Sequence, residues 1–165
     1  MGKVLAIANQ KGGVGKTTTS VNLAASLTVT KKNVLLIDLD PQGNATTGSG
    51  IDKSSLSLSV YDLLSENEKV ENVLLRPDAG YDLLPANGDL VAAEVDLMTG
   101  EDREVRLRSI IDSVRHNYDF IVVDCPPSLN MLTINAMVAA DGVVIPMQCE
   151  YYALEGLSAL MDTIS

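Results

Sequence analysis

A short glycine-rich stretch carries the clearest chemistry in this sequence. Residues 9–19 read Asn-Gln-Lys-Gly-Gly-Val-Gly-Lys-Thr-Thr-Thr. Glycine reaches backbone conformations closed to other residues, so Gly12, Gly13 and Gly15 let several N–H groups turn toward one point, where an anion can bind at the start of a helix. Lys16 adds a full positive charge there. The stretch therefore predicts a loop that binds phosphate groups.

This loop departs from the common phosphate-binding pattern in a way that adds a second cation. The pattern G-x-x-x-x-G-K-[ST] places a glycine five residues before Gly15, where this chain has Gln10. Lys11 opens the loop instead. A plain turn between a strand and a helix is the alternative, but Gly-Lys-Thr after an apolar strand and before a helical pattern favours nucleotide phosphates.

The residues around this loop suggest how a nucleotide and its metal could be held. Lys16 would contact the β- and γ-phosphates of ATP or GTP, and the Thr17 hydroxyl would coordinate Mg²⁺. Asp124 follows an apolar strand, the place of an acidic residue that holds the metal through water. A lone aspartate after a strand is also common as a turn or helix-cap residue, a reading that the nearby loop disfavours.

A second acidic pair follows another apolar strand. Asp38 and Asp40 lie two residues apart, so in extended backbone their side chains would share a face. One could steady the metal shell while the other orients or deprotonates an attacking water. The alternative is a capped turn before Pro41, and the spacing alone does not assign the two roles.

These residues need a scaffold that brings several strand ends together. Short apolar runs typical of buried parallel strands alternate with helical patterns. Strand–helix–strand units with right-handed crossovers predict an α/β fold of the P-loop NTPase type, with a mostly parallel twisted sheet between helices in three α/β/α layers. We expect strands at 3–8, 33–37, 81–84, 120–123 and 142–145, a loop at 40–50, and helices at 16–30, 59–64, 70–75, 89–98, 101–116, 132–140 and from 153 onward.

Composition limits the class of protein further. The 165 residues, 46% of them hydrophobic, suit one ordered domain, residues 1–165. A net charge of −10 disfavours a broad nucleic-acid surface on these residues. Apolar runs are too short to cross a bilayer and no signal-peptide pattern is present, so we expect a cytoplasmic location. Cys125 and Cys149 lack metal-ligand spacing and are predicted to be reduced structural thiols.

The helical pattern at 101–116 also carries many charges. Four arginines lie along it among acidic residues. Mixed charges of this kind usually form a solvated face rather than a binding patch. The arginines are Arg103, Arg106, Arg108 and Arg115.

Four segments, in order along the chain, resemble one protein family. Residues 11–18, KGGVGKTT, look like the deviant Walker A loop of the ParA/MinD group of P-loop ATPases. Residues 38–46, DLDPQGNAT, resemble the second motif of its ParA/Soj chromosome- and plasmid-partition branch. Residues 121–128, IVVDCPPS, are similar to the Walker B segment, and residues 144–156, VIPMQCEYYALEG, to a further ParA-type stretch. The resemblance covers the whole chain.

The resemblance implies a role for each matching residue. Lys11 is the signature lysine, which reaches the partner's phosphates across a nucleotide-sandwich dimer, and Gly12 lies where the two loops approach closely. Asp40 matches the carboxylate needed for hydrolysis, so the candidate catalytic residues are Lys11, Lys16 and Asp40. Candidate ligands of Mg²⁺ are Thr17, Asp38 and Asp124. ATP or ADP would be bound by Lys11, Gly12, Gly13, Val14, Gly15, Lys16, Thr17 and Thr18.

The resemblance also implies a function and partners. It points to a weakly hydrolysing ATPase of DNA segregation, in which ATP drives a homodimer that binds non-specific DNA. A centromere-binding protein of the ParB/Spo0J type triggers hydrolysis, and the protein acts in the cytoplasm, on the nucleoid, without a membrane partner. Because ParA-type ATPases run to about 250 residues, this chain resembles their first two thirds, and the basic residues used for DNA lie beyond it.

Three other readings remain open at this stage. The first is a MinD-like, membrane-associated regulator of cell division, although the segment Asp-Pro-Gln-Gly-Asn-Ala-Thr at 40–46 favours partition. The second is an iron–sulfur carrier ATPase with the same loop, which two cysteines without cluster-ligand context disfavour. The third is a chain that binds nucleotide without turnover or is not a stable domain alone.

Overall fold

A parallel sheet of five strands forms the centre of the molecule. The computed structural model describes residues 2–8 and 16–145, with side chains at 2–8 and 19–145. The strand order is β3-β2-β4-β1-β5, and every pair of neighbouring strands is parallel. The fold class predicted from the sequence is therefore confirmed. The strands are β1 (Lys3–Ile7), β2 (Val34–Asp38), β3 (Asp82–Leu84), β4 (Phe120–Asp124) and β5 (Gly142–Val144).

Helices connect the strands and lie close to the predicted positions. They are α1 (Lys16–Val29), α2 (Asn44–Gly48), α3 (Val60–Ser65), α4 (Val70–Val73), α5 (Leu90–Leu97), α6 (Arg106–Val114) and α7 (Met131–Ala139), with 3₁₀ turns η1 (Lys53–Ser55), η2 (Arg103–Val105) and η3 (Arg115–Asn117). The helix expected from residue 153 onward lies outside the described residues. None of the helices described is both long and apolar enough to cross a membrane.

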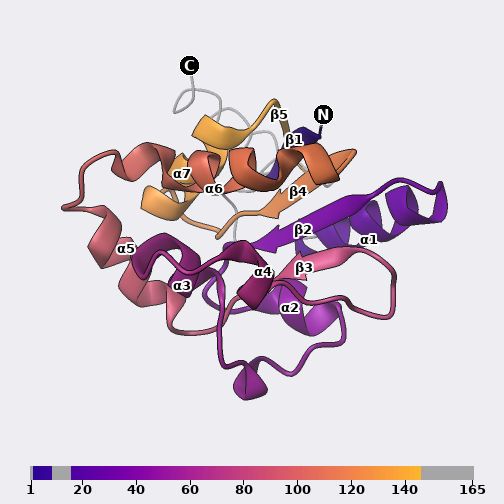
Figure 1. Ribbon diagram of the computed structural model, residues 1–165, viewed down its shortest axis with the longest axis horizontal. Coiled ribbons are helices and arrows are strands. Elements are labelled where there is room, and N and C mark those ends of the chain that lie inside the picture. The colour runs from indigo at the N-terminus through magenta and orange to yellow at the C-terminus, as the bar shows by residue number, and fades with distance from the viewer. Residues whose placement is uncertain (1, 9–15, 146–165) are drawn as a thin grey trace, which may run out of the picture.

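The helices cover both faces of the sheet, because successive strand residues point to opposite sides. Val4 and Ala6 of β1 belong to a core formed with α3, α5, α6 and α7. Ile7 belongs to a second core, formed with α1 and α2. Figure 1 shows α6 and α7 on one side of the strands and α1 on the other. The three-layer α/β/α arrangement is thus confirmed.

The segment expected as a loop at 40–50 contains a short helix instead. Helix α2 begins after Gly43, whose φ of 65° is left-handed, and the Thr47 N–H donates to the Gly43 carbonyl at 2.9 Å. Turn-forming residues dominate this stretch, and five residues are too few for a helical hydrophobic period to show. The sequence prediction was wrong here for that reason.

The prediction of a single helix at 101–116 was also wrong. The segment is broken into η2, α6 and η3. Asp102 has a left-handed φ of 53°, which a continuing α-helix does not allow. A residue of α7 stabilises the first turn of α6, since the Leu107 N–H donates to the buried Asn135 Oδ1 at 3.1 Å. A tertiary contact therefore sets where this helix begins.

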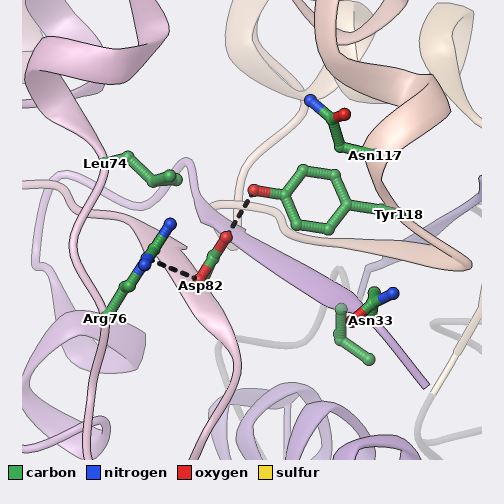
Figure 2. Close-up of a pocket in the computed structure, with 7 residues that line it drawn as sticks. Asn33, Leu74, Arg76, Asp82, Asn117 and Tyr118 are labelled. Atoms are coloured by element: carbon green, nitrogen blue, oxygen red, sulfur yellow. Dashed lines mark hydrogen bonds and ion pairs between the residues drawn. The ribbon is translucent and has the colours of Figure 1, made fainter.

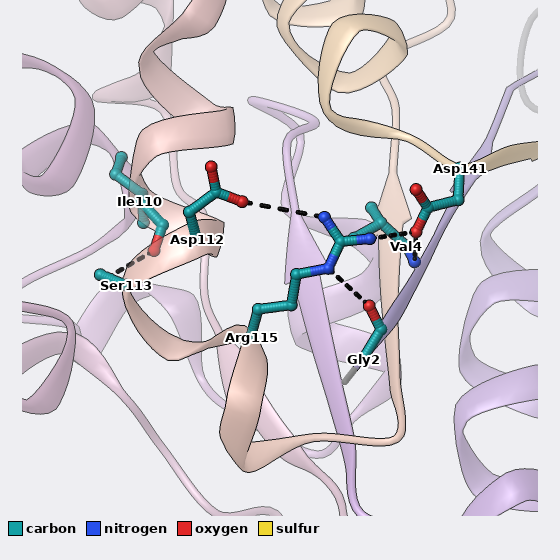
Figure 3. Close-up of polar contacts among 7 residues, drawn as sticks. All are labelled: Gly2, Val4, Ile110, Asp112, Ser113, Arg115 and Asp141. Atoms are coloured by element: carbon teal, nitrogen blue, oxygen red, sulfur yellow. Dashed lines mark hydrogen bonds and ion pairs between the residues drawn. The ribbon is translucent and has the colours of Figure 1, made fainter.

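Two of the arginines in this segment make contacts across the fold. Arg106 donates to the Leu64 carbonyl at 2.8 Å. Arg115 donates to the Gly2 carbonyl at 2.7 Å and forms an ion pair with Asp141, as Figure 3 shows. Asp141 in turn accepts from the Val4 N–H at 2.8 Å. The expectation of a merely solvated face was therefore wrong for Arg106 and Arg115, which tie α6 and η3 to other parts of the fold.

Candidate nucleotide and metal site

Two of the predicted site residues, Asp38 and Asp124, lie side by side where β2 and β4 end. β4 lies between β1 and β2, and its register places Asp124 beside Asp38 of β2 and beside Ile7 of β1. Neighbouring strands are about 4.8 Å apart, so the two aspartates start from adjacent backbone positions. In an open parallel sheet, ligands bind at this carboxyl edge.

The predicted phosphate loop is described only in part. Lys16, Thr17 and Thr18 form the first turn of α1, as predicted, and their side chains lie outside the described part of the structure. Lys11, Gly12, Gly13, Val14 and Gly15 fall in the residues 9–15 that the structure does not describe. Their roles therefore stay predictions.

Asp124 is held by a residue that the sequence analysis did not identify. Its carboxylate is fully buried, and its Oδ1 accepts a 2.6 Å hydrogen bond from the hydroxyl of Ser20, also fully buried. Ser20 is four residues after Lys16 on α1, and residues at that spacing lie on one helix face. That spacing is the signal in the sequence that could have identified Ser20.

The Asp38 carboxylate is a hub of three hydrogen bonds. Its Oδ1 accepts from the Asp40 N–H at 3.0 Å. Its Oδ2 accepts from the Thr46 N–H at 2.9 Å and from the Thr46 hydroxyl at 2.8 Å. Asp38 is fully buried, so these donors stand in for solvent. The sequence analysis missed Thr46, which lies inside the DLDPQGNAT segment and carries a hydroxyl that could have marked it.

Burial and the hydrogen bonds have opposite effects on the pKa of Asp38. Burial raises the pKa of this carboxyl to about 7, with a further rise from the negative charge of Asp124, while the hydrogen bonds from Asp40 and Thr46 lower it. Two buried carboxylates on adjacent strands repel each other. A cation between them would relieve both effects.

Asp40 forms a turn rather than continuing the strand. β2 ends at Asp38, so the alternation that would put both side chains on one face does not extend to Asp40. The Asp40 Oδ1 accepts from the Gln42 N–H at 2.9 Å, and its carbonyl accepts from the Gly43 N–H at 2.8 Å. The capped turn weighed as an alternative is thus present, and it places a nearly buried carboxylate at the same edge of the sheet.

The cysteines and the possible metal ligands remain to be placed. Cys125 is buried and Cys149 lies outside the described residues, so the reduced state of the two thiols stays a prediction. Among the described residues no group of three or more His, Cys, Asp or Glu side chains is arranged to hold a metal. Any metal at Asp38 and Asp124 would therefore draw further ligands from hydroxyl, phosphate or water oxygens.

A separate cavity of about 290 Å³ lies at the opposite, amino-terminal edge of the sheet. Figure 2 shows Asp82 at its centre, accepting a 2.6 Å hydrogen bond from the Tyr118 hydroxyl and pairing with Arg76 at 3.6 Å. Burial, and then the bond to Asp82, raise the pKa of Tyr118 well above its usual value. Asn33 precedes β2, so this cavity is at the far end of the strands from Asp38.

The parallel sheet, the glycine loop between β1 and α1, and the acidic strand ends define a protein of the P-loop nucleotide-binding class. The model of the AAA domain family matches residues 2–165. The chain is 54% identical over 165 residues to the sporulation initiation inhibitor protein Soj of Bacillus subtilis and 49% identical to the chromosome partitioning protein ParA of Myxococcus xanthus. These matches cover 99% of this chain, and 65% and 58% of the relatives.

Solved structures agree with this assignment. A cobyrinic acid a,c-diamide synthase from Mycobacterium smegmatis with a bound ATP analogue and magnesium has a TM-score of 0.95 and 43% identity, covering 99% of this chain and 67% of that one. A plasmid partition protein from Borrelia burgdorferi has a TM-score of 0.87 and 32% identity, covering 99% and 74%. The chain belongs to the AAA domain family, and its similarity to Soj and ParA confirms the family resemblance seen in the sequence.

The chain spans 58–65% of the length of several curated relatives that it matches. The relatives' activities and partners therefore belong to proteins longer than these 165 residues.

Proposed function

We propose that this chain is the nucleotide-binding part of a partition ATPase that binds ATP with Mg²⁺ and hydrolyses it slowly to ADP and phosphate. The observation that carries the proposal is the pair of buried carboxylates, Asp38 and Asp124, in register at the strand ends beside the start of α1. The names of the relatives and the ATP analogue, ADP and magnesium found with structural neighbours support it.

The residues at this edge fit a magnesium ion. Asp38 and Asp124 offer hard oxygen donors, which Mg²⁺ prefers, and burial together with the negative charge of Asp124 raises the pKa of Asp38. With the Thr17 hydroxyl they would hold the ion, directly or through water. When bound, Mg²⁺ would neutralise phosphate charge during the transfer reaction.

Other residues of the chain would bind the phosphates and activate the attacking water. Backbone N–H groups of Gly12, Gly13, Val14 and Gly15, with Thr18, would hold the phosphates, and Lys16 would neutralise their charge. Asp40 would orient or deprotonate the attacking water. Phosphoryl transfer depends mainly on such positioning and charge neutralisation.

The proposed switch requires a second copy of the chain. Lys11 would reach the partner's nucleotide, with Gly12 at the contact between the two loops. Closely packed phosphate charges recruit cations from both subunits, so ATP would favour the dimer and hydrolysis would weaken it. A ParB/Spo0J-type protein would trigger hydrolysis. The dimer would bind non-specific DNA on the nucleoid, in the cytoplasm, although the −10 charge of these residues disfavours a broad DNA-binding surface on them.

Two variants of the full chain test the enzymatic proposal. Lys16→Ala should abolish ATP binding, because it removes the lysine charge at the β- and γ-phosphates. Asp40→Ala should keep ATP binding within about threefold but lower hydrolysis by about 100-fold, within the range for loss of a general base. Binding is measured with a fluorescent ATP analogue and hydrolysis by phosphate release. Full turnover by the Asp40 variant would contradict the assignment of Asp40.

A further inference from the structure

Thr46 connects three segments of the fold through a single hydroxyl. The residue lies in α2 and is fully buried. Its Oγ1 donates to Asp38 Oδ2 at 2.8 Å and accepts from the Ala86 N–H at 2.9 Å. Ala86 follows the end of β3, so the hydroxyl joins the end of β2, helix α2 and the segment after β3.

Only a hydroxyl can make both of these contacts at once. It donates one hydrogen bond and still has lone pairs to accept another. Valine has nearly the same shape as threonine but would leave the Ala86 N–H without its acceptor in a buried place, and buried polar groups are normally paired. Serine would keep both bonds and lose only a methyl group.

The contacts of Thr46 reach Asp40 through Asp38. One oxygen of the Asp38 carboxylate is held by Thr46, and the other accepts from the Asp40 N–H at 3.0 Å. These bonds orient the carboxylate despite the like charge of Asp124 on the neighbouring strand. The turn is also confined sterically, because a Cβ on Gly43 would lie 2.8 Å from the Ala86 carbonyl oxygen. The segment after β3 therefore supports the turn that carries Asp40.

We propose that Thr46 is a positioning residue whose hydroxyl orients the Asp38 carboxylate and so sets the place of the Asp40 turn for ATP hydrolysis. This inference rests on the proposed function for its effect on hydrolysis. The hydroxyl does not touch the nucleotide in this role, so its loss should slow turnover and leave nucleotide binding almost intact.

The test compares Thr46→Val and Thr46→Ser in the full chain. We expect Thr46→Val to lower kcat by about tenfold or more, as small displacements of catalytic groups do, while the Kd for a fluorescent ATP analogue changes less than about threefold. Thr46→Ser should restore kcat. Ser49→Ala is the matched control, because Ser49 also lies at α2 but donates to the Ala45 carbonyl and contacts Tyr81 instead of the site.

A second measurement needs no hydrolysis. In nucleotide-free protein, hydrogen exchange at the amides of Ala86 and Asp40 should be faster by about tenfold or more in Thr46→Val than in wild type and in Thr46→Ser. Thr46→Ala replaces the valine variant if that variant does not fold. Unchanged exchange at both amides, or a Thr46→Ser variant as impaired as Thr46→Val, would overturn the proposal.

The two measurements separate this inference from the proposed function. A wild-type chain that binds no ATP, or does not hydrolyse it, would contradict the proposed function. Exchange at Ala86 and Asp40 would then still decide whether the Thr46 hydroxyl holds the turn.

Discussion

The protonation of the Asp38 carboxylate depends on its buried surroundings. Three hydrogen bonds favour its ionised form, but burial and the neighbouring Asp124 charge outweigh them and raise its pKa to about 7. The folded chain thus holds a proton on Asp38 at pH values where an unfolded chain, with a pKa near 3.8, has released it.

This imbalance predicts a pH dependence of stability. Between about pH 4 and pH 7 the folded state binds more protons at Asp38 than the unfolded state, so the contribution of Asp38 to stability falls as the pH rises through this window. Asp38→Asn removes the titration and should flatten the dependence. The measurement is urea unfolding at pH 4.5 and pH 7.5 in EDTA without nucleotide, and identical pH slopes in the two proteins would contradict the assignment.

Helix α2 shows how a short element can matter more than its length suggests. Its five residues carry little helical signal, yet Thr46 and the Gly43 turn connect it to Asp38 and to the segment after β3. Gly43 combines two constraints, a left-handed φ of 65° and a close approach to the Ala86 carbonyl. Both constraints disfavour replacing Gly43 by a residue with a side chain.

Two glycine substitutions separate these constraints. Gly50 also has a left-handed φ, of 83°, but a Cβ there would meet nothing within 4 Å. We expect Gly50→Ala to cost about 1–2 kcal/mol from backbone strain alone. Gly43→Ala should cost about 2–4 kcal/mol, because the clash with the backbone adds to the strain. Urea unfolding measures both values, and equal costs would show that the contact with Ala86 is unimportant.

In the whole molecule, the buried aspartates lie at the carboxyl edge of the sheet, and the cavity around Asp82 lies at the opposite edge. The strand order puts β4 between β1 and β2, which brings the two buried aspartates, Asp38 and Asp124, side by side. In the proposed dimer this edge would face a second copy, with Lys11 serving the partner's nucleotide. Nucleotide binding and dimerisation should then depend on different lysines.

We expect Lys11→Ala in the full chain to bind ATP within about threefold of wild type but to show no ATP-dependent rise in mass by light scattering, because the cation supplied to the second phosphate cluster is lost. Lys32→Ala is the control, since Lys32 is exposed just beyond the far end of α1. An unchanged ATP-dependent mass in the Lys11 variant would argue against a role across the dimer.

Much of this protein could be predicted from its sequence because the signals are local. Apolar runs fall within a few residues of β1 to β5, and the order of strands and helices indicates the parallel α/β fold. The glycine loop and the aspartates that end β2 and β4 also mark the site in the sequence, since in a parallel sheet the carboxyl ends of the strands meet at one edge. Family resemblance rests on the same short segments.

Only the tertiary structure decided what surrounds those residues. The bond from Ser20 to Asp124 spans 104 positions and that from Thr46 to Ala86 spans 40, so a local pattern could mark Ser20 or Thr46 as a candidate but could not show which residue each hydroxyl contacts. The start of α6 depends on Asn135, 28 residues further along. Sequence periodicity reports which residues prefer a buried strand or helix, whereas the pKa of Asp38 and the position of the Asp40 turn depend on burial and on donors that chain folding brings together.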